Sequence, residues 1–144
     1  MTDPTPDEMK SFNQAIIEEF RANNGVVTGQ FAGAPLLLLT TTGARSGNRH
    51  TTPVVFGTDG DDVFVVASKA GADTNPAWFH NLVAHPEVTV EVPGDTFAAH
   101  AVVADEARRA RLYAQQVAVM PGFAEYQAKT GRVIPVVVLE RLSA

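Results

Sequence analysis

Short β-rich segments joined by tight turns make up much of the sequence after Gly25, and this spacing limits the fold more than any other feature. The connections include "GARSGN" and "TDGDD". Parallel neighbours need a crossover of about a dozen residues or more, so connections this short indicate antiparallel pairs. The first four predicted strands are 26–31, 35–42, 50–57 and 62–68.

The second half of the chain adds a hairpin, a last strand and helices. "EVTVEV" and "TFAAHAVVA" predict a hairpin about "PGD". Segment 132–141 predicts the last strand, and because Pro135 cannot donate to a ladder, we expect an edge position or a bulge there. The predicted helices are residues 6–24, a short helix from Pro76 to Ala84, a helix from the Asp105 cap to Met120, and a turn of helix after the Pro121–Gly122 break.

Six or seven mainly antiparallel strands with three to four helices predict an α+β domain, whose sheet curls toward a barrel to hide its edges. A length of 144 residues with 45% hydrophobic content suits one domain spanning residues 1–144. Without cysteine, neither a disulfide framework nor a Cys-based zinc site is possible, and the four histidines are not spaced as metal ligands. No metal is therefore expected.

The N-terminal segment "MTDPTPDEMK" lacks the order of charges and apolar residues found in a signal peptide, and no apolar run is long enough to span a membrane. We expect a cytoplasmic protein with no integral membrane segment. The first helix is amphipathic but carries more acidic than basic residues, which leaves at most weak peripheral membrane association.

Positive charge is scarce in the middle of the chain. Between Ala22 and Ala107 the only Lys or Arg residues are Arg45, Arg49 and Lys69, against nine Asp and Glu. With a net charge of −5 there is no general basic surface, so nucleic-acid binding is not expected. The three cations suit a smaller anionic ligand.

The stretch "TTTGARSGNRHTTP" at 40–53 has the chemistry of an anion cradle, because a tight glycine turn frees backbone N–H groups beside Arg45 and Arg49. A solvated hairpin tip gives the same pattern, so the loop alone does not decide. In an antiparallel meander, however, the start of strand 50–57 and the end of strand 62–68 lie at the same end of the sheet. We therefore expect Lys69 near Arg45, and a site for a phosphate or polycarboxylate.

Two aromatic residues are further candidates for contact with a ligand. Trp78, the only tryptophan, has two interpretations, a core anchor or a residue lining a planar ligand. Tyr126 follows the Pro121–Gly122 break, where a lid could hinge, although a packed tyrosine of the core is the more common case. No serine lies in a nucleophile elbow, so hydrolysis is not supported.

Six segments, in order, resemble the deazaflavin-dependent nitroreductase family between about Phe12 and Arg141: "FRANNG", "PLLLLTTTGARSG", "TTPVVF", "VASKAG", "NPAWFHNLVAHPEV" and "YQAKTGRVIPVVVLER". The resemblance implies a split β-barrel that binds coenzyme F-420, an 8-hydroxy-5-deazaflavin with a phospholactyl and oligoglutamate tail, in preference to FMN. The polyanionic tail would account for the scarce cations.

The resemblance also implies the site residues. The cofactor-binding positions are Ala44, Arg45, Ser46, Arg49, His50, Thr51, Thr52, Pro53, Val54, Val55, Ala67, Ser68, Lys69, Ala77, Trp78 and Asn81. Among them, Arg45, Ser46, Lys69 and either Arg49 or His50 correspond to positions that hold the tail. Ser68, Tyr126 or water would donate hydrogen bonds to the reacting acceptor. The implied acceptor pocket is Val55, Met120, Phe123 and Tyr126, where nitroreductase members carry tyrosines.

The predicted activity is hydride transfer from reduced coenzyme F-420 to a small-molecule acceptor such as a quinone or cyclic enone. Nitro compounds are less favoured, because only one of the four pocket tyrosines is present. The alternative is a carrier without turnover, which holds the deazaflavin or an apolar ligand such as a fatty acid. A homodimer stays open, because the first helix and the last strand suit either a second copy or their own barrel.

Overall fold

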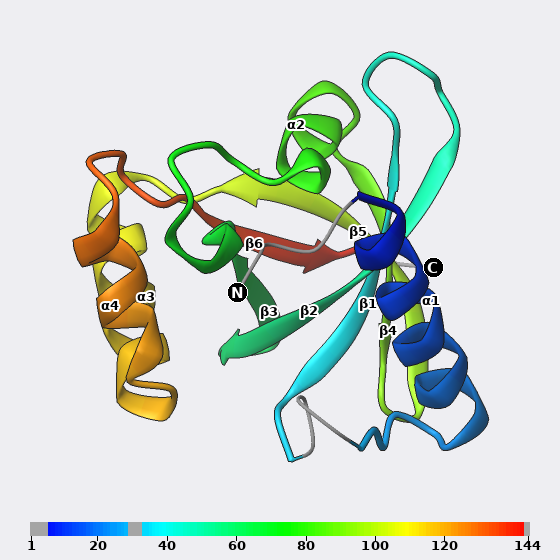
Figure 1. The fold of residues 1–144 in the computed structure, drawn as a ribbon. Coiled ribbons are helices and arrows are strands. Elements are labelled where there is room, and N and C mark those ends of the chain that lie inside the picture. The colour runs from blue at the N-terminus through cyan, green and yellow to red at the C-terminus, as the bar shows by residue number, and fades with distance from the viewer. Residues whose placement is uncertain (1–5, 29–32, 143–144) are drawn as a thin grey trace.

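The structure, a computed structural model, describes residues 6–28 and 33–142. Its six strands form a closed antiparallel barrel in the order β1-β2-β3-β6-β5-β4 (Figure 1). The strands are β1 (Leu36–Thr42), β2 (Arg49–Asp59), β3 (Asp62–Val66), β4 (Glu87–Val92), β5 (Asp95–Val103) and β6 (Val136–Arg141). The helices are α1 (Pro6–Ala22), α2 (Ala77–Ala84), α3 (Glu106–Val119) and α4 (Gly122–Lys129), with a 3-10 turn, η2, at Lys69–Gly71. The predicted α+β barrel is confirmed.

Strand β1 is buried on both faces, which explains its unbroken run of leucines. Leu37 and Leu39 belong to the cluster that fills the barrel. Leu36 and Leu38 pack outward against α1, whose Ile16, Ile17 and Phe20 are buried in the same cluster. Helix α1 therefore covers the outside of β1, at the right in Figure 1.

The other helices lie at two further sides of the barrel (Figure 1). Trp78 and Leu82 of α2 join the cluster that fills the barrel, so α2 packs against its interior. Leu112 of α3 and Phe123 of α4 pack outside the barrel with Phe64 and other residues of β3 and β6. None of the described helices is both long and apolar enough to cross a membrane.

The last strand corrects one expectation. Strand β6 pairs with β3 on one side and with β5 on the other, so the predicted edge position is wrong. Pro135 lies just before the strand, where its missing N–H costs no ladder bond, and its carbonyl accepts the N–H of Ala67 at 2.9 Å. Closure of the barrel removes the edge that the proline suggested.

Two other strand predictions also differ from the structure: one predicted strand is not formed in its described part, and another ends earlier than expected. Residues 26–28 of the expected strand 26–31 are not in a strand, and 29–31 lie outside the described residues. Strand β3 ends at Val66, and the chain then turns through η2, whose Lys69 has a φ of +46°.

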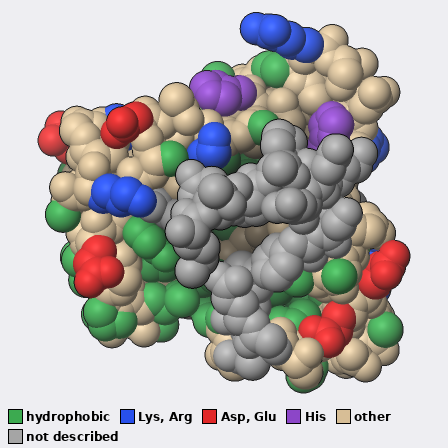
Figure 2. All heavy atoms as spheres, viewed as in Figure 1, with side chains coloured by type: hydrophobic (Ala, Val, Ile, Leu, Met, Phe, Trp, Pro, Cys, Tyr) green, Lys and Arg blue, Asp and Glu red, His purple; other side chains and the backbone are tan. Residues whose placement is uncertain are grey.

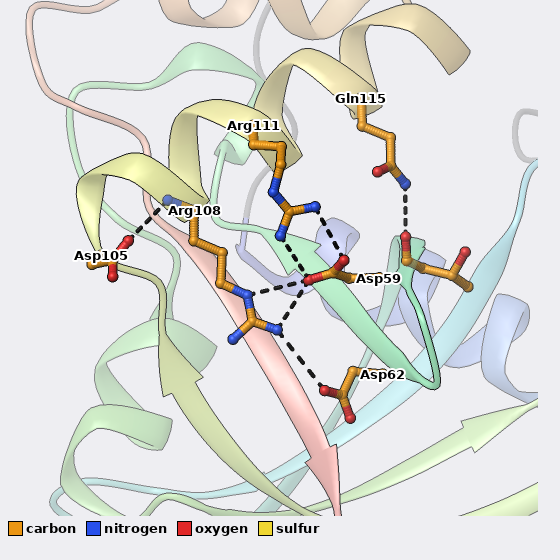
Figure 3. Close-up of polar contacts among 7 residues, drawn as sticks. Asp59, Asp62, Asp105, Arg108, Arg111 and Gln115 are labelled. Atoms are coloured by element: carbon orange, nitrogen blue, oxygen red, sulfur yellow. Dashed lines mark hydrogen bonds and ion pairs between the residues drawn. The ribbon is translucent and has the colours of Figure 1, made fainter.

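An ion-pair network fastens α3 to the β2–β3 hairpin (Figure 3). The Asp59 carboxylate accepts hydrogen bonds from Arg108 at 3.0 Å and from Arg111 at 3.1 Å. Gln115 donates to the carbonyl of Thr58 at 2.7 Å. Arg108, Arg111 and Gln115 are three and four residues apart, so they lie on one side of α3. Their contacts therefore set the rotation of the helix on the barrel.

Candidate functional site

A cavity of about 1320 Å³ lies between α1, the β1–β2 hairpin and α2. Three elements that are far apart in sequence build its wall. The lining residues are Asn13, Gln14, Ile17 and Arg21 of α1; Thr41, Gly43, Ala44, Arg45, Ser46, Asn48, Arg49, His50, Thr51 and Thr52 of the hairpin; and Ala77, Trp78, His80 and Asn81 of α2.

The tip of the hairpin is a compact turn. The N–H of Gly43 donates to the Asn48 carbonyl at 2.7 Å, and the N–H of Gly47 donates to the Gly43 carbonyl at 3.0 Å. A Cβ on Gly43 would lie 2.4 Å from the Ser46 Oγ, so the Ser46 side chain would have to move if Gly43 were replaced. The Ser46 hydroxyl also accepts the N–H of Asn48 at 3.1 Å. Ser46 therefore helps to close the turn.

Helix α2 supports this tip through Asn81. Its side-chain oxygen accepts the N–H of Ala44 at 3.0 Å, and its amide nitrogen donates to Thr41 at 3.2 Å. Arg49 is held from the other side, where it donates to Thr89 of β4 at 2.8 Å. Asn81 and Arg49 thus both make contacts that fix the shape of the cavity wall.

The remaining cations of the wall differ in what they bind. Within residues 6–28 and 33–142, Arg45 and His50 are exposed and have no hydrogen-bond or ion-pair partner among the protein side chains. Arg21, which the sequence reasoning missed, makes two hydrogen bonds to Glu91 at 2.8 and 3.0 Å. The hydrogen bond to Glu91 raises the pKa of the Arg21 guanidinium. Arg45 and His50 therefore present unpaired exposed side chains to a ligand, and Arg45 adds a positive charge.

Trp78 is a core anchor, and its position at the cavity leaves its role in lining a planar ligand as a prediction. It is 8% exposed and belongs to the cluster that fills the barrel, and it also lines the cavity. Pro53, Val54, Val55, Ala67, Ser68 and Lys69 are not among the lining residues.

Lys69 does not reach this cavity, and the register of the strands explains why. The β2–β3 ladder stops at Phe56, whereas β2 continues along β1 back to Arg49. Seven residues of strand extend over roughly 20 Å, so β3 ends well short of the hairpin tip. The Lys69 ammonium instead approaches Thr74 at 3.4 Å.

Ser68 and Tyr126 lie on two elements, the 3-10 turn η2 and helix α4, that pack against each other. Helix α4 packs on the 3-10 turn so tightly that a Cβ on Gly71 would lie 2.9 Å from the Tyr126 carbonyl oxygen. The N–H of Gly71 donates to the Ser68 carbonyl at 2.9 Å. The two predicted donors therefore lie on segments that touch, although no contact joins their side chains.

Three of the four implied acceptor-pocket residues pack together. Phe123 is buried, and Met120 and Tyr126 are partly buried in the same cluster, with the rings of Phe123 and Tyr126 in edge contact at 5.2 Å. Val55 instead packs against the α1 cluster, so it does not join them. Figure 2 shows hydrophobic side chains gathered on the side of the molecule where α3 and α4 lie.

The sequence profile of the family described as "F420H(2)-dependent quinone reductase" matches residues 13–141, which include every lining residue of the cavity. This chain belongs to that family. The resemblance to F-420-dependent reductases is thereby confirmed.

The quinone reductase family includes curated relatives of similar length. An F420H(2)-dependent quinone reductase of Mycobacterium tuberculosis (strain ATCC 25618 / H37Rv) is 38% identical over 128 residues, which cover 85% of each chain. A solved structure titled "Structure of F420-H2 Dependent Reductase (FDR-A)" has 34% identity and a TM-score of 0.68, over 74% of this chain and 94% of its own. A structure titled as a domain-swapped dimer has 31% identity and a TM-score of 0.70, over 94% of this chain and all of its own.

Sequence reasoning missed α1 as part of the site. No part in the site is predicted for this amphipathic helix from the sequence, whereas Asn13, Gln14 and Arg21 line the cavity. A helical repeat shows which face of a helix is apolar, but not which part of its polar face a neighbouring hairpin covers. Arg132, described below, was missed for a similar reason, because its partners lie in a loop about 60 residues earlier.

Proposed function

We propose that this chain is an oxidoreductase that transfers a hydride from reduced coenzyme F-420 to a quinone. The observation that carries the proposal is a cavity of about 1320 Å³ at which an acidic protein presents Arg45 and His50 on a glycine turn. Membership of the quinone reductase family over residues 13–141 supports the same activity. Chains named F420H(2)-dependent quinone reductase give the acceptor class.

The donor set of the cavity fits an anionic coenzyme tail. Arg45 and His50 are exposed at the tip, and Arg49 lies beside them on β2. Guanidinium groups bind phosphate and carboxylate oxygens through paired hydrogen bonds. The backbone N–H groups of Gly43, Ala44, Gly47 and Asn48 are already bonded within the wall of the cavity, so side chains rather than these N–H groups would hold the tail. We infer from this fit that the hairpin tip holds the tail, with Asn81 keeping the tip in place.

The bound coenzyme would supply a two-electron hydride donor, so the chain needs to bind and orient rather than provide redox groups of its own. Arg45 would offset negative charge of the tail at one end of the site, and His50 would add a hydrogen-bonding ring beside it. Trp78 gives the cavity an apolar wall against which a planar ring can pack. Ser68 and Tyr126 are the proposed donors to the acceptor oxygen as it gains negative charge.

Two measurements test the proposal together. Trp78 lines the cavity and is the only tryptophan, so its fluorescence should change on titration with coenzyme F-420 and respond less to FMN. Reduced coenzyme mixed with protein and a quinone should then regain its deazaflavin absorbance faster than without protein. Equal or tighter FMN binding would overturn the cofactor assignment, and binding without acceleration for several acceptors would favour a carrier.

The acceptor preference has its own test. Met120 and Phe123 offer apolar faces in place of tyrosine hydroxyls, and a nitro group gaining charge needs such donors more than a quinone does. We expect kcat/KM for a quinone to exceed that for a bicyclic nitroimidazole by at least about tenfold, or about 1.4 kcal/mol. A preference for the nitro compound would contradict this interpretation of the α4 side.

A further inference from the structure

Arg132, in the loop between α4 and β6, reaches across to the segment that follows β3. Its Nε donates to the carbonyl of Ala72 at 2.8 Å, and its Nη1 donates to the side chain of Asn75 at 2.7 Å. Its Nη2 donates to the carbonyls of Ser68 at 2.9 Å and Ala67 at 3.2 Å. One guanidinium thus contacts four residues between 67 and 75, which we call the crossing segment.

The backbone of Arg132 is itself fixed to α4. Its carbonyl accepts a hydrogen bond from Gln127 at 2.7 Å, and its N–H approaches the hydroxyl of Thr130 at 3.3 Å. Thr130 in turn donates to Asp73 of the crossing segment at 2.9 Å. Gln127 is anchored by Arg109 of α3. The crossing segment is therefore tied to α4 and α3 through side chains, with Arg132 at the centre.

The crossing segment needs such support because its own backbone is strained and sparsely bonded. Lys69 has a φ of +46°, a left-handed conformation that costs a side-chain-bearing residue free energy. Inside the turn, Gly71 donates to Ser68 and Ala72 donates to Lys69, both in 3-10 geometry. The rigid planar guanidinium of an arginine, which binds four acceptors here, holds such a turn better than the flexible ammonium of a lysine can.

Resting on the proposed function, we propose that Arg132 is a positioning residue for hydride transfer. It holds the crossing segment against α4, so that Ser68 on one side and Tyr126 on the other keep a fixed separation. Arg132 does not line the cavity at the hairpin tip, and the residues proposed to hold the tail lie on different elements. Loss of Arg132 should therefore affect the reaction more than coenzyme affinity.

The test compares Arg132→Lys and Arg132→Ala with Arg108→Lys. Arg108 is the matched control, because it is a half-buried arginine near the N-terminal end of α3 whose ion-pair partners, Asp59 and Asp62, lie on the β2–β3 hairpin and not on the crossing segment. Three quantities are measured for each variant: coenzyme affinity, the single-turnover rate of hydride transfer to a quinone, and amide hydrogen exchange at Gly71 and Ala72 without coenzyme.

For both Arg132 variants we expect hydrogen exchange at Gly71 and Ala72 to accelerate by at least about tenfold, because the turn opens more often. The transfer rate should fall by at least about tenfold, with the dissociation constant changing by less than about threefold. Added guanidinium should restore part of the rate to Arg132→Ala. Arg108→Lys should leave the exchange and the rate unchanged.

Unchanged exchange and rate in Arg132→Lys would overturn the proposal, as would a loss that follows thermal stability equally in the Arg108 control. If Arg132→Ala does not fold, Asn75→Ala removes one acceptor of the guanidinium and should shift the same quantities in the same direction, to a smaller extent. Failure of the wild type to bind coenzyme would overturn the proposed function and with it the role of Arg132 in hydride transfer, whereas coenzyme binding with unchanged rate and exchange in the Arg132 variants would overturn the role of Arg132 alone.

Discussion

The side-chain oxygen of Asn81 accepts the backbone N–H of Ala44 at 3.0 Å, which joins helix α2 to the tip of the β1–β2 hairpin. The amide nitrogen of the same side chain donates to Thr41 at 3.2 Å. These two bonds use one acceptor and one donor, so they also fix the orientation of the amide. Two walls of the cavity are thereby held at a set distance, and Arg45, next to Ala44, is carried with them.

Replacement of Asn81 by alanine should weaken coenzyme binding without removing any proposed contact to the tail. Both hydrogen bonds are lost, each worth about 0.5–1.5 kcal/mol, and the tip becomes more mobile. We expect the dissociation constant of coenzyme F-420 to rise by about three- to tenfold. Fluorescence titration measures it, with His85→Ala as the control, because His85 follows α2 and does not line the cavity. An unchanged affinity in Asn81→Ala would show that the tip holds its shape alone.

Arg45 should act through charge, because its side chain is exposed beside the cavity. Arg45→Ala should weaken coenzyme binding by about tenfold at low salt, and by less as salt screens the interaction. Titrations at two ionic strengths, with coenzymes of short and long glutamate tails, measure both effects. Arg141→Ala is the control, because Arg141 is equally exposed but binds Asp95 on the β4–β5 hairpin. Equal losses in both variants would point to net charge alone.

Tyr126→Phe should slow the reaction and leave the affinity for the coenzyme nearly unchanged. The tyrosine is partly buried against Phe123, so removal of its hydroxyl leaves the packing in place. A lost hydrogen bond to the developing negative charge is worth about 0.5–1.5 kcal/mol, or roughly a two- to tenfold decrease in kcat. Steady-state rates with a quinone test this, alongside the coenzyme dissociation constant. If Tyr126→Phe reduces the quinone as fast as the wild type, the Tyr126 hydroxyl is not a donor to the acceptor.

Gly71 should not tolerate alanine, for two separable reasons. Its φ of +81° is unfavourable for any side chain, at about 1–2 kcal/mol. A Cβ would also lie 2.9 Å from the Tyr126 carbonyl and 3.1 Å from its Cα, which adds ~1–3 kcal/mol of overpacking. Gly60→Ala isolates the first effect, because Gly60 has a φ of +62° with nothing within 4 Å. Denaturant unfolding of both variants should show the larger loss for Gly71→Ala, and equal losses would contradict the contact with α4.

Local patterns predicted the strands and hairpins well, because turn signals and apolar runs are written in adjacent residues. The pairing of β1 with β2, which ends at Thr42 and Arg49, and the turn at Gly60 between β2 and β3 both follow from such signals. The placement of Lys69 did not follow, because it depends on how far β2 outruns β3. That offset is set by closure of the whole barrel, and no local pattern records it.

For the candidate site, too, features built from neighbouring residues were predictable and features that depend on distant residues were not. The glycine turn with Arg45 and His50 was predictable, because the residues that build it are neighbours in the sequence. The contributions of Arg21 and Arg132 were not, since Glu91 lies 70 residues from Arg21 and Ala72 lies 60 residues from Arg132. The position of Val55 was misjudged because alternation along β2 turns it outward toward α1, away from Phe123.

Asp59 should make the stability of the fold depend on pH in the acidic range. Hydrogen bonds from Arg111 and Arg108 hold the pKa of the Asp59 carboxyl below its usual value (Figure 3). In the unfolded chain the carboxyl returns to an ordinary pKa of about 3.9, so there it binds a proton more readily than in the folded state. Stability therefore rises with pH wherever the unfolded state binds more protons. The contribution of Asp59 is fully present above about pH 5 and is lost as the pH falls through 3.9 toward the lower folded pKa.

Asp59→Asn should reduce the free energy of unfolding at pH 7, and its difference from the wild type should shrink between pH 5 and pH 3. Urea unfolding across that range measures this difference, with Asp61→Asn as the control, because Asp61 is exposed in the same hairpin and stands outside the network. A difference that stays constant down to pH 3 would mean that Asp59 acts through packing or through a neutral hydrogen bond rather than through its charge.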